Sequence, residues 1–226
     1  MARILLFDID KTLIRSRGAG RAAMDEAFAE VFGLDSATAN VSVDGRTDRG
    51  IFGEIIATHR LSPDGDTAFQ RVSAAYLQRL AGSLAAQPGV VLPGVETLLP
   101  LLQHSHGAVG LATGNMRRGA ETKLAHFGLW HWFSGGGFGD ETSVRADLVR
   151  AAIRDMAAAL GVEPDPQNTI VIGDTPLDVK AAQQAGARSL AVATGSYSTG
   201  ALRDTAADWV LEDLSDTAGV MKLLST

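Results

Sequence analysis

ILLFDIDKT, residues 4–12, is the stretch that decides the fold, because four apolar residues run directly into a pair of aspartates. A continuous apolar run of this length is typical of a strand in a parallel sheet whose two faces are covered by helices. Such sheets bind their ligands at the carboxyl ends of the strands. We therefore expect Asp8 and Asp10 at the ligand-binding edge of an α/β fold.

A second acidic cluster follows a second apolar run. Residues 169–172 are TIVI, and GDTPLD follows at residues 173–178. Because parallel strands end at the same edge of a sheet, Asp174 and Asp178 should meet the first two aspartates there. So many negative charges repel one another unless a cation lies among them, and an all-oxygen site suits a hard divalent ion. The sequence therefore predicts a Mg²⁺ site.

The composition narrows the possible partners. The chain has 226 residues, of which 46% are hydrophobic and 20% charged, and its net charge is −6 with no dense Lys/Arg run. This charge disfavours nucleic acid and anionic membranes as partners. The chain has no cysteine, which excludes disulfides, thiolate nucleophiles and Cys-ligated metals. The first apolar run ends too early for a signal peptide, and none is long enough to span a membrane. We expect a cytoplasmic monomer or homodimer that acts on a small molecule.

The apolar pattern changes twice along the chain. Between residues 16 and 88 it has only helical periodicity, and from residue 89 onward strands alternate with helices. The simplest architecture is a doubly wound parallel-sheet core, made of residues 1–15 and 89–226, with a helical cap at 16–88 inserted after the first strand. The cap should lie over the acidic edge. The expected strands after the cap are 108–112, a short one near 132–133, 170–172, 189–193 and 209–211.

The spacing of the first two aspartates suits acid–base chemistry. Two residues apart in an extended chain, Asp8 and Asp10 have side chains on the same face. Asp8, held by a metal, could attack phosphorus, while Asp10, with a pKa raised by its negative neighbour, could protonate the leaving oxygen and later deprotonate water. The alternative is that each acidic cluster only caps a helix or turn.

A polar turn after residues 108–112 offers groups that bind phosphate. Thr113 supplies a hydroxyl, Gly114 allows close backbone approach, and Asn115 adds an amide before a helix. The same residues could simply form a helix N-cap. Phosphoryl transfer also needs a cation besides the metal. Arg145 begins the helix before the strand that leads to Asp174, so it is our candidate, with Arg150 and Arg154 as competitors.

In order and context these residues resemble the four motifs of the haloacid dehalogenase-like (HAD) hydrolase superfamily. Asp8-x-Asp10-x-Thr12 looks like the first motif, Thr113 the second, Arg145 the third, and Gly173-Asp174-x-x-x-Asp178 the fourth. The helical insertion resembles the small C1 cap of the phosphoglycolate phosphatase and β-phosphoglucomutase-like branch. Two positions depart from the common pattern, since Lys11 replaces a glycine and the third motif is Arg instead of Lys.

The resemblance implies a role for each matching residue. Asp8 would be the nucleophile and a Mg²⁺ ligand, and Asp10 the general acid and base with its backbone carbonyl on the metal. Asp174 would bind the metal directly, whereas Asp178 would bind through water or orient its neighbours. The residues implied to hold the phosphoryl group are Thr113, Gly114, Asn115 and Arg145.

The cap should select the substrate. Gly45-Arg46-Thr47-Asp48 resembles a loop that contacts substrate in related caps, so Arg46 and Thr47 are candidate substrate residues, although the segment could equally be a capped helix start. We expect a Mg²⁺-dependent phosphatase acting on a phosphoglycolate-like or sugar phosphate. The alternatives are a β-phosphoglucomutase-like phosphomutase and a non-catalytic phosphate-sensing protein. A receiver domain fits less well. Its phosphate-accepting residue should follow the third strand, and here the corresponding region near Phe133 enters a run of glycines.

Overall fold

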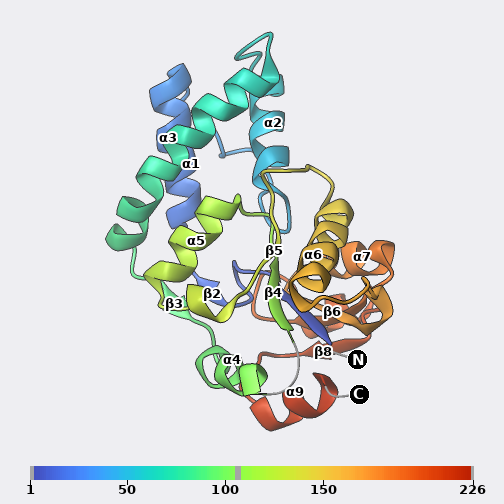
Figure 1. Cartoon of the computed structure of the whole chain (residues 1–226). Helices are drawn as coiled ribbons and strands as arrows, with labels where there is room; N and C mark the ends of the chain where they lie inside the picture. Colours follow the sequence, from blue (N-terminus) through green and yellow to red (C-terminus); the bar gives the residue numbers. More distant parts are fainter. Residues whose placement is uncertain (1–2, 105–107, 225–226) are drawn as a thin grey trace.

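The computed structural model describes residues 3–104 and 108–224, and it confirms the expected α/β class. The larger lobe in Figure 1 is built on a six-stranded sheet in the order β5-β4-β1-β6-β7-β8, with every pairing parallel. The strands are β1 (Ile4–Phe7), β4 (Ala108–Ala112), β5 (Gly136–Gly137), β6 (Thr169–Gly173), β7 (Arg188–Val192) and β8 (Trp209–Leu211).

The first strand lies in the middle of the sheet, which explains its unbroken apolar run. Leu5 and Phe7 belong to one hydrophobic cluster, which includes residues of α4 (Val95–His104), α5 (Arg117–His126) and α9 (Thr217–Leu224). Ile4 and Leu6 belong to another, with α6 (Arg145–Leu160) and α7 (Pro176–Ala185). Because alternate side chains of a strand point to opposite faces, both faces of β1 are covered by helices.

The edge strand β5 corrects one expectation. Residues 130–132 form a 3-10 helix, η1 (Trp130–Trp132), and the strand predicted near 132–133 lies at Gly136–Gly137 instead. A Cβ atom on Gly136 would lie 2.1 Å from the Leu111 carbonyl oxygen, and one on Gly137 would lie 2.1 Å from that of Leu148. The prediction was wrong because the backbone here must fit tightly between β4 and α6, which selects glycine over the aromatic residues that favour strands elsewhere.

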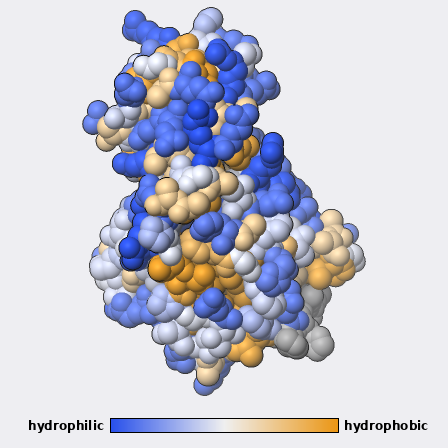
Figure 2. Space-filling view, turned by 90° about the vertical axis from the view of Figure 1, so that its left-hand side faces the viewer, coloured by the Kyte–Doolittle hydropathy of each residue, from blue (hydrophilic) through white to orange (hydrophobic). Residues whose placement is uncertain are grey.

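The smaller lobe has its own core. Helices α1 (Ala19–Phe32), α2 (Asp48–Thr58) and α3 (Gly65–Ala86) pack around Phe28, Phe52 and Tyr76, whose rings meet edge to face. Figure 2 shows this lobe joined to the larger one through a narrower waist. The remaining short elements are η2 (Pro166–Asn168) and α8 (Thr199–Arg203).

The two chain crossings between the lobes run side by side. Strand β2 (Ile14–Arg15) pairs antiparallel with β3 (Val90–Val91), which forms a two-stranded ribbon at the waist. We propose residues 16–88 as the cap and residues 1–15 and 89–226 as the core, because the ribbon coincides with both boundaries. Within residues 3–104 and 108–224, no helix combines the length and apolar character needed to cross a membrane.

Candidate active site

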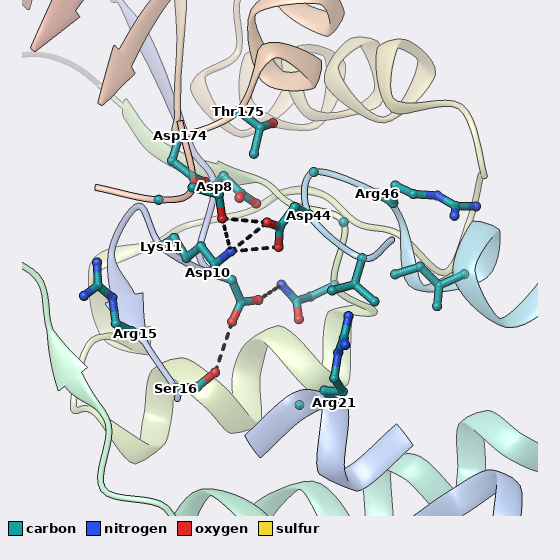
Figure 3. Close-up of a pocket in the computed structure, with 18 of the residues that line it drawn as sticks. Asp8, Asp10, Lys11, Arg15, Ser16, Arg21, Asp44, Arg46, Asp174 and Thr175 are labelled. Carbon is teal, nitrogen blue, oxygen red and sulfur yellow. Dashed lines mark hydrogen bonds and ion pairs between the residues drawn. The ribbon is translucent and has the colours of Figure 1, made fainter. Parts of the chain in front are cut away.

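Three aspartates from two segments that are distant in the sequence converge at the carboxyl edge of the sheet. In the register of the sheet, Phe7 lies beside Leu111 and Ile172, so that Asp8 lies level with the ends of β4 and β6. Oxygens of Asp8, Asp174 and Asp178 lie within 4.8 Å of one another, and all three residues are buried. Figure 3 shows Asp8 and Asp174 close together above Asp10. The two acidic clusters therefore meet as the sequence predicted.

The chemistry of this cluster fits a hard divalent cation. Asp174 Oδ2 is buried and has no hydrogen-bond partner among the described residues. Burial, followed by the negative charges of Asp178 and Asp8, raises the pKa of Asp174 to about 8. A buried oxygen without a partner is costly, and a Mg²⁺ ion would supply the partner. A Cβ atom on Gly195 would lie 1.8 Å from this oxygen, so glycine keeps its free side open.

Asp178 is already engaged on both oxygens. Its Oδ1 accepts from Arg145 Nε at 2.8 Å, and its Oδ2 accepts from the Thr175 hydroxyl and amide at 2.7 and 3.0 Å. Thr175 and Asp178 thereby form a capping box that begins α7. This acid orients its neighbours and has little capacity left for direct metal binding.

Arg145 is the cation that reaches the cluster. Its side chain is 10% exposed, and its guanidinium lies 3.1 Å from Asp8 Oδ1 and 2.5 Å from Asp178 Oδ1. Burial raises the pKa of Asp8 to about 6 even though the charge of Arg145 opposes it. The competing Arg150 pairs with Asp147 in a half-exposed contact. The other competitor, Arg154, is exposed.

The surroundings of Asp10 contradict the expected pKa. Burial alone would raise the pKa of Asp10, but the Lys123 ammonium at 2.6 Å and the Asn115 amide at 2.9 Å together lower it below its ordinary value. The predicted raised pKa is therefore wrong for this structure. Figure 3 shows a further contact, from the Ser16 hydroxyl to the other oxygen of Asp10.

The sequence interpretation missed Lys123. Its side chain is only 5% exposed and lies on α5 with the buried Ala120 and Leu124. A lysine at a position that shares the apolar face of a helix is a detectable signal, because buried lysines are usually paired.

The turn that the sequence predicts to bind phosphate divides into two parts. Gly114 and Asn115 line the cavity. Thr113 is fully buried and outside the lining, and its hydroxyl accepts from Asn115 Nδ2 at 2.9 Å. In this arrangement Thr113 orients Asn115, and Asn115 in turn donates to Asp10.

The cap closes directly on this turn. A Cβ atom on Gly114 would lie 2.0 Å from the Arg46 carbonyl oxygen. The Asp48 amide donates to the Gly114 carbonyl at 2.7 Å, and Asp48 Oδ2 accepts from the Met116 amide at 2.8 Å. Asp48 is buried, which raises its pKa to about 6. The sequence interpretation did not assign a role to this carboxylate, which joins cap to core.

The two cap residues predicted to contact substrate have other partners here. Arg46 lines the cavity, but its guanidinium pairs with Glu54 at 2.6 Å and extends away from the carboxylates in Figure 3. Thr47 is buried, and its hydroxyl caps α2 by accepting from the Gly50 amide at 3.1 Å. The capped helix start, which the sequence left open, describes Thr47.

A cavity of about 670 Å³ lies between the lobes, above the aspartates. Lys11 lines the cavity and has a left-handed backbone conformation, with φ 64°. Glycine, which is common at this motif position, adopts that conformation readily. The Lys11 ammonium contacts both oxygens of Asp44, in the cap, at 2.8 Å, and the Ser196 hydroxyl donates to the same carboxylate. This cluster ties the cap loop to two loops of the core.

Comparison with known proteins assigns the family. The profile of the haloacid dehalogenase-like hydrolases matches residues 5–183. The chain belongs to this family. The probable phosphatase IndB of Dickeya dadantii (strain 3937) is 24% identical over an alignment of 229 positions, which covers 99% of this chain and 95% of that protein. The phosphoglycolate phosphatase of Cereibacter sphaeroides is 27% identical over 187 residues, 81% of this chain and 82% of that protein.

Solved structures share the HAD fold. A hydrolase from Pseudomonas syringae superposes with a TM-score of 0.74 at 24% identity, and the superposition covers 100% of both chains. The match extends over the cap as well as the core. The resemblance that the motifs suggested, to the HAD superfamily and its phosphoglycolate phosphatase branch, is thereby confirmed.

Proposed function

We propose that this HAD protein is a Mg²⁺-dependent phosphatase that hydrolyses a small phosphorylated metabolite through an aspartyl-phosphate on Asp8. The observation that supports it most is the buried meeting of Asp8 with Asp174, Asp178 and Arg145 at one edge of the sheet. A carboxylate nucleophile, an oxygen cluster for a cation and a fixed guanidinium are the parts that phosphoryl transfer needs. The family and its phosphatase relatives agree with a phosphoric monoester hydrolase.

The metal would be held by Asp8, Asp174 and the backbone carbonyl of Asp10, with Asp178 nearby. When bound, Mg²⁺ neutralises the phosphoryl oxygens and the crowded carboxylates. The residues present fit this ion, since Asp174 Oδ2 is buried without a partner among the described residues and the other donors are oxygens.

In the first step, a carboxylate oxygen of Asp8 attacks phosphorus and the ester P–O bond breaks. Asp10 gives its proton to the leaving oxygen, so the alcohol departs neutral. Lys123 and Asn115 hold Asp10 in its ionised form in this structure. The negative charge of an arriving phosphate ester favours proton uptake by Asp10, because like charges disfavour the ionised form.

In the second step, Asp10 removes a proton from water, which attacks the aspartyl-phosphate. The bond between phosphorus and Asp8 breaks, and inorganic phosphate and the free carboxylate result. Arg145 stays beside Asp8 throughout and supports the transferred group together with the neighbouring backbone of Gly114 and the amide of Asn115. Thr113 acts through Asn115, which it contacts.

The substrate proposed is phosphoglycolate-like or a sugar phosphate, and Arg46 and Thr47 remain candidate substrate residues if the cap loop rearranges. Support comes from the phosphoglycolate phosphatase relative and from the cavity of about 670 Å³, which is in the range of small-molecule sites. The absence of cysteine from the sequence agrees with the proposed cytoplasmic location.

A screen of phosphorylated metabolites for phosphate release tests the proposal. Wild type should release phosphate in Mg²⁺ but not in EDTA, and Asp8→Asn should be inactive. Asp204→Asn, which changes an exposed aspartate remote from the cavity, serves as the matched control. Unchanged turnover by Asp8→Asn would exclude the assigned nucleophile.

The same screen separates the alternatives. Isomer formation from a hexose phosphate without net phosphate release would favour a phosphomutase, which uses the same pair of acids. Mg²⁺ binding without turnover of any ester would favour a phosphate-sensing protein.

A further inference from the structure

More cationic side chains line the cavity than form ion pairs with carboxylates. Seven cationic side chains from the described part of the chain line it: Lys11, Arg15, Arg17, Arg21, Arg46, Lys123 and Arg145. Four of them are in ion pairs, namely Lys11 with Asp44, Arg46 with Glu54, Lys123 with Asp10, and Arg145 with Asp8 and Asp178. Arg15 donates instead to the Thr194 carbonyl at 2.6 Å.

Arg17 and Arg21 remain without an ion pair among the described residues. The Arg17 side chain forms no hydrogen bond there, and Arg21 forms a single one, to the Val41 carbonyl at 3.3 Å. Arg21 also lies near enough to Asp44 to help lower the pKa of that carboxyl, but burial and the contacts with Lys11 and Ser196 have larger effects on it. Asp44 is thus already paired.

Both arginines come from the segment where the chain enters the cap. Arg17 directly precedes Gly18, the N-cap of α1, and Arg21 lies in the first turn of that helix. Both are exposed and line the cavity. Figure 3 shows Arg21 extending from α1 toward the cavity that contains Asp10. The transferred phosphoryl group has a separate cation, Arg145, beside Asp8. Arg17 and Arg21 are therefore available to a different part of a bound molecule.

We propose that Arg17 and Arg21 form a second anion subsite, so that the preferred substrate carries a carboxylate or a second phosphate away from the phosphoryl group that is removed. This inference rests on the proposed phosphatase function. Guanidinium groups pair with both anions through two parallel hydrogen bonds, and partly exposed ones need little desolvation. The cavity has room for such a molecule, and Met24, Val43 and Ile51 give it an apolar wall.

Matched ester pairs test the subsite. We compare kcat/KM for 3-phosphoglycerate and glycerol 3-phosphate, which differ by a carboxylate, and for fructose 1,6-bisphosphate and fructose 6-phosphate, which differ by a phosphate. Wild type should prefer the more anionic member of at least one pair, and the pair that shows the preference identifies the anion.

The variant Arg17→Gln/Arg21→Gln should reduce this preference about tenfold or more, because charge-assisted hydrogen bonds are lost. The control Arg60→Gln/Arg71→Gln should keep it. Arg60 shares with Arg17 an exposed, left-handed backbone with φ 49°, and Arg71 shares with Arg21 a single contact to a carbonyl, that of Val31. Neither control residue lines the cavity.

Two results would overturn the subsite: no preference in wild type for either anionic ester, or a preference that survives in the Arg17→Gln/Arg21→Gln variant. If no ester is hydrolysed, the phosphatase proposal fails and calorimetry decides the subsite. Wild type should then bind 3-phosphoglycerate about tenfold or more tightly than the variant does. Equal affinities, or no binding by wild type, would reject it.

Discussion

Replacing Arg145 by methionine removes the cation between Asp8 and Asp178. The side chain is 10% exposed, and its Nη2 atom lies 3.1 Å from the Asp8 carboxylate and 2.5 Å from that of Asp178. Removing one partner of a buried ion pair costs about 3–5 kcal/mol, because the remaining charge stays buried without compensation. Since Asp8 already has a raised pKa, it can bind a proton in the variant. We therefore expect a loss of about 3–5 kcal/mol and not twice that amount.

Urea unfolding in EDTA at neutral pH measures this loss. The matched control is Arg150→Met, in the same helix, whose ion pair with Asp147 is 43% and 56% exposed and should contribute only about 0–1 kcal/mol. Added Mg²⁺ should restore part of the stability of Arg145→Met, because the ion supplies the missing positive charge. Turnover should fall about 100-fold or more in Arg145→Met and stay unchanged in Arg150→Met. Equal unfolding free energies of the two variants in EDTA would refute the reasoning.

Three further predictions concern pH, the cap and the metal cradle. Burial raises the pKa of Asp8 and Asp48 to about 6 and that of Asp174 to about 8, from an ordinary 3.8. Between these values the folded state binds more protons than the unfolded state. The free energy of unfolding in EDTA should therefore fall as pH rises from about 4 to 8. Urea unfolding at pH 5 and at pH 8 measures this change. Mg²⁺ should stabilise the protein more at pH 8 than at pH 5. A higher free energy of unfolding at pH 8 than at pH 5 in EDTA would contradict the prediction. Asp44→Asn removes the partly exposed ion pair with Lys11, so KM should rise a few-fold, with a loss of stability below about 1 kcal/mol. Steady-state kinetics at low and high salt test this prediction. A KM equal to that of wild type would count against a role of this ion pair in cap closure. Gly195→Ala would place a Cβ atom 1.8 Å from Asp174 Oδ2, so Mg²⁺ affinity measured by calorimetry should drop, whereas Gly82→Ala, with open space around it on α3, should bind Mg²⁺ as wild type does.

The central sheet could be predicted because its signal is local. Residues 4–7 and 108–112 are apolar throughout, and each strand was located from its own sequence with the bounds that the structure has. The site at its edge followed from topology, since parallel strands must end together. Asp8 and Asp174 were therefore expected in one place although 166 positions separate them in the sequence.

What the sequence could not show are contacts that depend on how distant segments pack. Lys123 lowers the pKa of Asp10 from a helix more than a hundred residues away, and Asp48 accepts from the Met116 amide across the junction between the lobes. The strand at Gly136–Gly137 has no propensity signal, because its position is fixed by the space between Leu111 and Leu148. Contacts between distant segments leave no periodic pattern in the sequence.

The role of Asp8 as the residue that accepts the phosphoryl group is tested most directly by trapping. An acid quench during turnover of an aryl phosphate in Mg²⁺, followed by borohydride reduction and peptide mass spectrometry, should convert Asp8 to homoserine. The conversion should be absent without substrate. Rapid phosphate release with Asp8 unmodified, or with the modification on another carboxylate, would contradict the account.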